Sequence, residues 1–119
     1  MTVLGLHHVQ IACPAGAEDD LRAFYGGLLG LPEIPKPPAL AVRGGVWFRV
    51  GAQELHCGVE AGFVPAKKAH PCLLVDDLEA IAERVRSAGG EVRPDENIPG
   101  VRRFNTDAPC GNRIAIQQA

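Results

Sequence analysis

Three histidines are the residues of this sequence best suited to chemistry. His8, His56 and His70 each lie in a segment where apolar and polar residues alternate. Because successive side chains of a strand point to opposite faces, each histidine falls on the face away from the apolar residues. Three neutral imidazoles that converge with open coordination positions suit Zn²⁺, Ni²⁺ or Fe²⁺. The pattern therefore indicates a candidate metal site, in which the ion could act as a Lewis acid or hold an oxygen ligand.

The same pattern has a plainer interpretation, which stays open at this point. A single histidine on a strand is more often a hydrogen-bonded wall residue than a ligand, and only the matching faces of three strands favour the metal. Convergence also requires the strands that carry His8 and His70 to lie near each other. His7 should point to the helix side or to the sheet edge, and is left out of the site.

Five more residues are candidates for substrate binding: Gln10, Cys72 and Gln117, which share the faces of the histidines, and Trp47 and Arg49, which share one face of their own strand that could line the same cavity. Trp47 would form a wall, and Arg49 could pair with a substrate carboxylate or enolate. The alternative is a core tryptophan and a solvated arginine. Cys72 could be a thiolate ligand or a nucleophile, but no feature that would lower its pKa is visible, which favours a buried thiol.

Two similar runs of elements must position these residues. In the first run we expect a strand over 3–13, a helix over 17–29, a proline-rich loop over 32–38, and strands over 39–43, 46–50 and 53–59. The helix has an apolar stripe at Leu21, Phe24, Tyr25 and Leu28. Gly44-Gly45 is a hairpin signal between the second and third strands.

The second run follows a linker over 60–68. We expect a strand over 69–75, a helix over 77–88, and strands over 91–93, 101–106 and 113–118. Asp76 is the expected N-cap of this helix, with Glu79 completing a capping box. The sequence thus predicts an α+β fold of two tandem βαβββ modules, about 3–60 and 69–118, within one domain, 1–119. The helices should cover one face of the sheet and leave the other face to line a cavity.

Composition excludes several classes of protein. The 119 residues carry a formal charge of −2 and no basic run, which argues against nucleic acid as a partner. The apolar runs are too short for a membrane span, and no signal peptide is visible at the start. The four cysteines have no CxxC spacing, so we expect reduced thiols in the cytoplasm and no zinc finger.

Four segments resemble the signatures of the vicinal oxygen chelate superfamily: His8-Val9-Gln10-Ile11; Phe24-Tyr25 with Leu28-Leu29-Gly30-Leu31; His70 with Val75-Asp76-Asp77-Leu78; and Asp107 with Gly111-Asn112-Arg113-Ile114. That group includes glyoxalase I, extradiol dioxygenases, fosfomycin-resistance proteins and bleomycin-binding proteins. The resemblance implies a U-shaped incomplete barrel with helices on its outer face, a divalent metal ion (Zn, Ni, Fe or Mn) and a homodimer.

Two of the metal-ligand positions of that superfamily match this sequence, and two differ. His8 matches the histidine of the first strand, and His70 matches the histidine that opens the second module. His56 falls where many members have a glutamate. The last ligand is usually a glutamate, but this sequence has Ala115 there. Gln117, one pleat further, could supply an oxygen ligand or a hydrogen bond but cannot serve as a base.

These residues lead to two main expectations of function. The first is a glyoxalase- or dioxygenase-like protein, a lyase, isomerase or dioxygenase, that binds a metal and a small oxygen-bearing substrate; its catalytic residues are not identified. The second is a metal-free binding protein of the bleomycin-resistance type, although an aromatic content of 5% counts against a pocket with aromatic walls. A third is a regulatory or structural relic of the fold.

Overall fold

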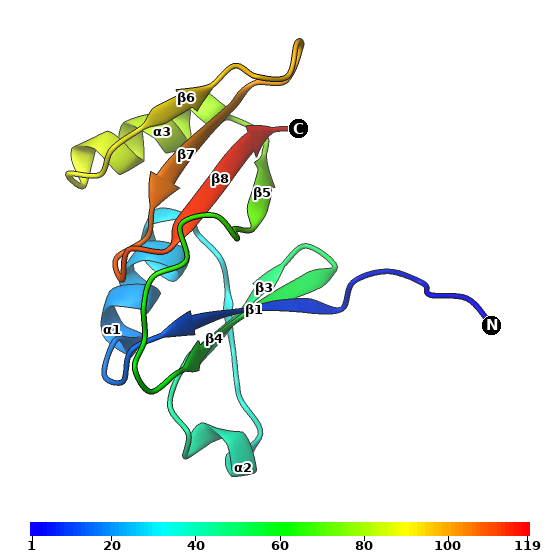
Figure 1. The fold of residues 1–119 in the computed structure, drawn as a ribbon, viewed down its shortest axis with the longest axis vertical. Helices are drawn as coiled ribbons and strands as arrows, with labels where there is room; N and C mark the ends of the chain where they lie inside the picture. The colour runs from blue at the N-terminus through cyan, green and yellow to red at the C-terminus, as the bar shows by residue number, and fades with distance from the viewer. The chain divides into compact units, whose positions relative to one another are not determined.

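The computed structural model describes residues 1–119 as two compact units, Met1–Val64 and Pro65–Ala119 (Figure 1). Each unit contains one four-stranded sheet with both parallel and antiparallel pairs, and in both units a strand and a helix precede the other three strands. The predicted α+β fold with two βαβββ modules is thereby confirmed. No helix has the length and apolar character that a membrane span requires.

The sheet of the first unit has the order β1-β4-β3-β2. Its strands are β1 (His8–Cys13), β2 (Glu33–Ile34), β3 (Val46–Val50) and β4 (Gln53–Val59). β1 runs parallel to β4, whereas β3 is antiparallel to both of its neighbours. The bounds of β3 and β4 are those that the alternating pattern predicts, because Gly51-Ala52 forms the tight turn between them.

The helix of the first unit covers one face of this sheet. It begins as α1 (Glu18–Leu21), with three acidic residues in its first turn, and continues as a π-helix, η1 (Arg22–Leu28). Leu21 and Tyr25 are buried, and the rings of Tyr25 and Phe48 lie 5.6 Å apart between centroids. The opposite face of the sheet therefore carries the polar side chains of β1, β3 and β4.

The predicted strand over 39–43 is wrong. Residues 38–41 form a short helix, α2 (Pro38–Ala41), and the hairpin partner of β3 is β2. Pro38 occupies the first turn of α2, where its missing N–H and fixed φ are tolerated. Gly44-Gly45 therefore joins a helix to a strand and does not form a hairpin turn. A short apolar run does not by itself distinguish a strand from a helix.

The second unit repeats this arrangement with the sheet order β5-β8-β7-β6. Its strands are β5 (Cys72–Val75), β6 (Arg93–Asp95), β7 (Arg103–Asp107) and β8 (Arg113–Gln118), and its helix is α3 (Leu78–Ser87). The predicted apolar stripe of α3, Leu78, Ile81, Ala82 and Val85, is buried. β5 begins later than predicted, so His70 precedes the strand instead of lying on it.

The N-cap of α3 is Asp77 and not the predicted Asp76. The Asp77 side chain accepts a hydrogen bond from the Ala80 N–H at 3.0 Å. Replacing Asp77 with alanine should therefore lower the free energy of unfolding by about 1 kcal/mol, since the first turn of α3 loses its cap. Urea denaturation followed by circular dichroism would measure this loss. Asp76→Ala is the control, and an equal loss there would contradict the assignment of the cap.

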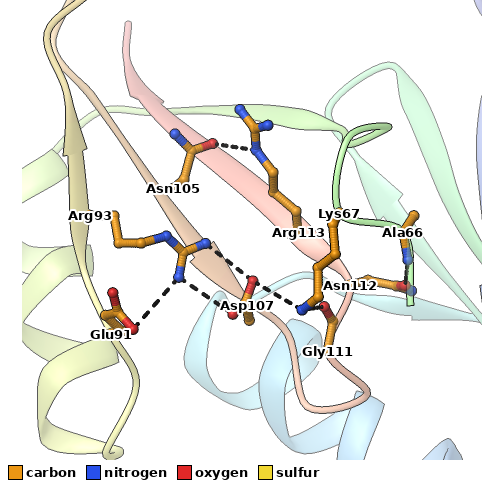
Figure 2. A network of polar contacts seen from close by, with 9 residues as sticks. All are labelled: Ala66, Lys67, Glu91, Arg93, Asn105, Asp107, Gly111, Asn112 and Arg113. Atoms are coloured by element: carbon orange, nitrogen blue, oxygen red, sulfur yellow. Dashed lines mark hydrogen bonds and ion pairs between the residues drawn. The ribbon is translucent and has the colours of Figure 1, made fainter. Parts of the chain in front are cut away.

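A polar network fixes the start of the second unit to the turn between β7 and β8 (Figure 2). Asp107 forms ion pairs with Arg93 at 3.1 Å and with Lys67 at 3.8 Å. The buried Asn112 accepts a hydrogen bond from the Ala66 N–H at 3.0 Å through its side-chain oxygen. Asn112 thus fixes the backbone at the start of the unit, whereas Asp107 pairs with two cationic side chains.

Candidate functional site

Three rings from three neighbouring strands form a stack on the open face of the first unit. The rings of Trp47 and His56 are nearly parallel, 3° apart, with centroids 3.8 Å apart. The rings of His56 and His8 lie 15° from parallel at 4.3 Å. The sheet produces this ring stack, His8–His56–Trp47, because β4 lies between β1 and β3 and aligns His56 directly with Trp47. His56, in the middle, is 5% exposed.

Glu54 belongs to the same face, although the sequence analysis did not select it. Its carboxylate lies 2.9 Å from Nε2 of His56 and 3.6 Å from a guanidinium nitrogen of Arg49. In the parallel register Glu54 is the partner of His8. The signal was available, because Glu54 precedes His56 by two residues and must share its face.

The surroundings of Glu54 favour its ionised form. The hydrogen bond with His56 lowers the pKa of the Glu54 carboxyl most, and the charges of His7 and Arg49 lower it further, against a smaller opposing effect of desolvation. The open face thus presents a carboxylate at neutral pH, directly beside an imidazole.

The same shift predicts a pH dependence of stability. A carboxyl whose pKa is lower in the folded state than in the unfolded state stabilises the fold above the unfolded pKa. We therefore expect the stability difference between wild type and Glu54→Gln to be largest near neutral pH. It should shrink as the pH falls from about 5 to 3, where carboxyl groups titrate. Urea denaturation at several pH values measures it, and a difference that grows with acidity would contradict the shift.

Gln10 and His7 flank the ring stack. Gln10 is aligned with His56 and is exposed. Its side-chain amide lies against Gly58, where an added Cβ would come within 2.9 Å of it. Nδ1 of His7 lies 3.1 Å from Nδ1 of His8, so the neighbour that was left out of the site contacts the proposed ligand.

The remaining predicted residues lie in the second unit. His70 is exposed, with Nδ1 2.8 Å from the Lys68 carbonyl oxygen. Cys72 is exposed and not buried, and its sulfur lies 3.8 Å from the side-chain oxygen of Gln117. Desolvation raises the pKa of the Cys72 thiol, and nearby Arg103 only partly offsets this effect. The sulfur is therefore a protonated thiol at neutral pH and a poor nucleophile.

Ala115 stands where the resemblance implies a carboxylate ligand. It is 1% exposed and lies on β8 between Cys72 of β5 and Asn105 of β7. Neither neighbour supplies a carboxylate. Glu54, on the first unit, is the acidic side chain that the structure places beside one of the predicted histidines.

The donors of the open face fit a transition metal in their chemistry. Two imidazoles and one carboxylate gather around β1 and β4, and such nitrogen and oxygen donors suit Zn, Ni, Fe or Mn. Within either unit no three His, Cys, Asp or Glu side chains are already arranged around one point. Since imidazole lone pairs lie in the ring plane, the stacked rings of His8 and His56 must turn to share an ion.

Two hollows lie against the Trp47 end of the ring stack. The larger, about 480 Å³, is lined by Ile34, Pro35, Lys36, Pro37, Trp47, Arg49 and Glu54. The smaller, about 160 Å³, is lined by Gln10, Lys36, Leu40, Arg43, Gly44, Trp47, Gly58 and Val59. Trp47, Arg49 and Gln10, all predicted to contact a substrate, therefore border open space on one face of one sheet.

No family model and no curated protein matches the sequence. Among solved structures, a protein assigned to the glyoxalase family from Bacillus anthracis is 45% identical, with a TM-score of 0.94 over 99% of this chain and 97% of that one. A lactoylglutathione lyase from Agrobacterium tumefaciens is 19% identical, with a TM-score of 0.74 over 97% and 93% of the two chains. The fosfomycin resistance protein FosX from Listeria monocytogenes is 12% identical, with a TM-score of 0.78 over 99% and 95%. The last two show the fold alone, whereas the first shows the family: the chain belongs to the glyoxalase family, within the vicinal oxygen chelate superfamily.

Proposed function

We propose that this protein binds a divalent metal ion together with a small oxygen-bearing substrate on the open face of the first unit. The observation that carries the proposal is the cluster of His8, His56 and Glu54, two imidazoles and an ionised carboxylate on adjacent parallel strands. His70, in the second unit, stays a prediction from the sequence, and the proposed site does not depend on it. The reaction class is that of a lyase, isomerase or dioxygenase.

Each residue has a distinct role in this proposal. His8, which is exposed, would offer an imidazole nitrogen to the ion, and Glu54 would offer a carboxylate oxygen. Bound there, a divalent ion supplies Lewis acidity toward adjacent oxygens of a substrate. His56 orients Glu54 through their 2.9 Å contact and becomes a ligand itself if its ring turns away from the stack. Arg49 and Gln10 are proposed to contact the substrate.

The test is direct measurement of the metal. The untagged protein is purified, incubated with Zn²⁺, Ni²⁺, Fe²⁺ or Mn²⁺ in turn, desalted and analysed by mass spectrometry for metal content. We expect close to one equivalent of one metal per chain. Less than about a tenth of an equivalent of every metal tested would overturn the proposal. Methylglyoxal–glutathione adducts, catechols and fosfomycin, tested with the loaded protein, would then separate the reaction classes.

One observation favours a second function, a metal-free binding protein of the bleomycin-resistance type. The ring stack supplies the aromatic wall that the low aromatic content argued against, and the larger hollow borders it. This function predicts ligand binding that chelation of metal with EDTA leaves unchanged.

We also propose a cytoplasmic homodimer. Its support is the exposed apolar side chains of the N-terminal segment, Val3, Leu4 and Leu6, next to β1, which is an edge strand of its sheet. An exposed edge with apolar side chains is a ready site for pairing with another chain. Light scattering at several concentrations measures the mass of the particle, and a monomer throughout would contradict the dimer.

A further inference from the structure

We propose that the larger hollow binds a planar aromatic carboxylate, with its ring stacked on Trp47 and its carboxylate against Arg49 and Lys36. This names a substrate class for the open face, and it rests on the proposed function only in taking that face as the substrate face. The metal ion enters neither the argument nor the binding test.

One face of the Trp47 ring has no second ring stacked on it, and the Lys36 ammonium lies over the Trp47 ring at 6.0 Å from its centre. His56 covers the other face at 3.8 Å, nearly in parallel, and it belongs to β4. β3, which carries Trp47, lies between β4 and β2, so the second face of the ring is turned toward β2. On that side Ile34 is aligned with Trp47, and Pro35 follows it. A flat ligand inserted there would add a further ring to the stack.

The walls and size of the hollow favour a conjugated ring. Ile34, Pro35 and Pro37 give it apolar walls, and its volume is about 480 Å³. Pockets that hold small organic ligands commonly measure about 300–1,000 Å³. An aromatic ring placed face to face with Trp47 gains the offset stacking that a saturated ring of equal size cannot make.

The charges that line the hollow favour an acid. Lys36 and Arg49 are cationic and Glu54 is anionic, so the lining has a net positive charge. The negative charge of Glu54 is already engaged by His56 and Arg49. The Arg49 side chain is 49% exposed, and the Lys36 ammonium lies 6.0 Å from the centre of the Trp47 ring. A carboxylate at the edge of a stacked ring would therefore lie near two cations: Arg49, which pairs with Glu54 at 3.6 Å, and Lys36, which also donates to the Gly44 carbonyl oxygen.

Trp47 is the only tryptophan of the chain, so its fluorescence reports on this hollow directly. Three matched probes separate ring from charge: 2-naphthoate, the neutral 2-naphthamide, and the saturated acid decahydro-2-naphthoate. Each is titrated into the full chain after treatment with EDTA, with calorimetry as the second measurement. We expect 2-naphthoate to bind saturably, and each of the other two to bind at least about fivefold more weakly. Equal affinity for either comparison probe would overturn the proposal.

Two variants locate the binding. Arg49→Gln should lower the affinity for 2-naphthoate at least about fivefold. The same variant should change the affinity for 2-naphthamide less than about twofold. Arg86 is an exposed arginine of α3. Arg86→Gln therefore removes the same charge in the second unit and should change the affinity for neither probe. Trp47→Leu is first shown by circular dichroism to be folded like the wild type. Calorimetry should then show an affinity for 2-naphthoate that is at least about fivefold lower. Undiminished binding to either Arg49→Gln or folded Trp47→Leu would overturn the site.

The two proposals fail separately. Aromatic acid binding is measured without metal, and metal content is measured without acid. A protein that binds 2-naphthoate but no metal keeps this inference and loses the metal proposal. A protein that binds metal but no aromatic acid keeps the metal proposal and loses this inference.

Discussion

If the proposed metal site is correct, replacing His8 with alanine should lower the affinity for a divalent metal ion at least about 100-fold, because a first-strand imidazole is lost from a site with few protein donors. His8 is exposed, and its register partner is Glu54, so the substitution removes one donor and leaves the carboxylate in place. Its ring also covers one face of His56, so Trp47 fluorescence provides a check that the rest of the stack is retained. Competition with a fluorescent chelator measures the affinity.

The matched control is His7→Gln. His7 contacts His8 at 3.1 Å between their Nδ1 atoms, and glutamine retains a hydrogen-bonding group there. We expect its loss of affinity to be at least about tenfold smaller than that of His8→Ala. If the two variants lose equal affinity, or if His8→Ala binds as tightly as wild type, the assignment of His8 as a ligand is wrong.

Gly45→Ala should be the most destabilising single-methyl change in the first unit. Gly45 immediately precedes β3, and an added Cβ would overlap the carbonyl oxygen of Cys57, a backbone atom of the buried strand β4. Its φ of 85° is also in the left-handed region, which disfavours any residue with a Cβ. Backbone clash and strain together should lower the free energy of unfolding by about 4 kcal/mol or more.

Gly51→Ala is a control that separates the two causes. Gly51 follows the other end of β3 with a φ of 58°, but an added Cβ would meet nothing within 4 Å. Strain alone should then cost about 1–2 kcal/mol. Urea denaturation followed by Trp47 fluorescence compares the variants, and equal losses would show that the approach of Gly45 to Cys57 does not matter.

Much of the fold could be predicted because alternation and helical stripes depend on burial alone. β3, β4 and β8 have their predicted bounds, and the apolar stripe of α3 is buried as expected. The prediction of a strand over 39–43 was wrong because four apolar residues after Pro38 suit a helical turn as well as a strand. The predicted position of the N-cap of α3 was wrong by one residue, since both Asp76 and Asp77 have a side chain that can cap a helix.

The sequence could predict which face of the strands carries the candidate site, but not which of its residues contact one another. The alternating pattern placed His8 and His56 on the faces away from the apolar residues, and the structure stacks their rings with that of Trp47. It could not supply the parallel alignment of His8 with Glu54, which is set by a pairing between distant strands. The pattern could place Glu54 on the face of His56, two residues on, but not beside His8.

The parallel pairing within each unit has a consequence for the order of folding. β1 hydrogen-bonds to β4, the last strand of the first unit, and β5 pairs in the same way with β8 near the end of the chain. Neither sheet can be completed until its final strand is available, and such distant pairings make folding slow. During synthesis the first unit can close once Val59 has left the ribosome, and the second once Gln118 has done so. Until Gln118 is available, the edges of β5 and β7 that pair with β8 stay unpaired and can meet other chains.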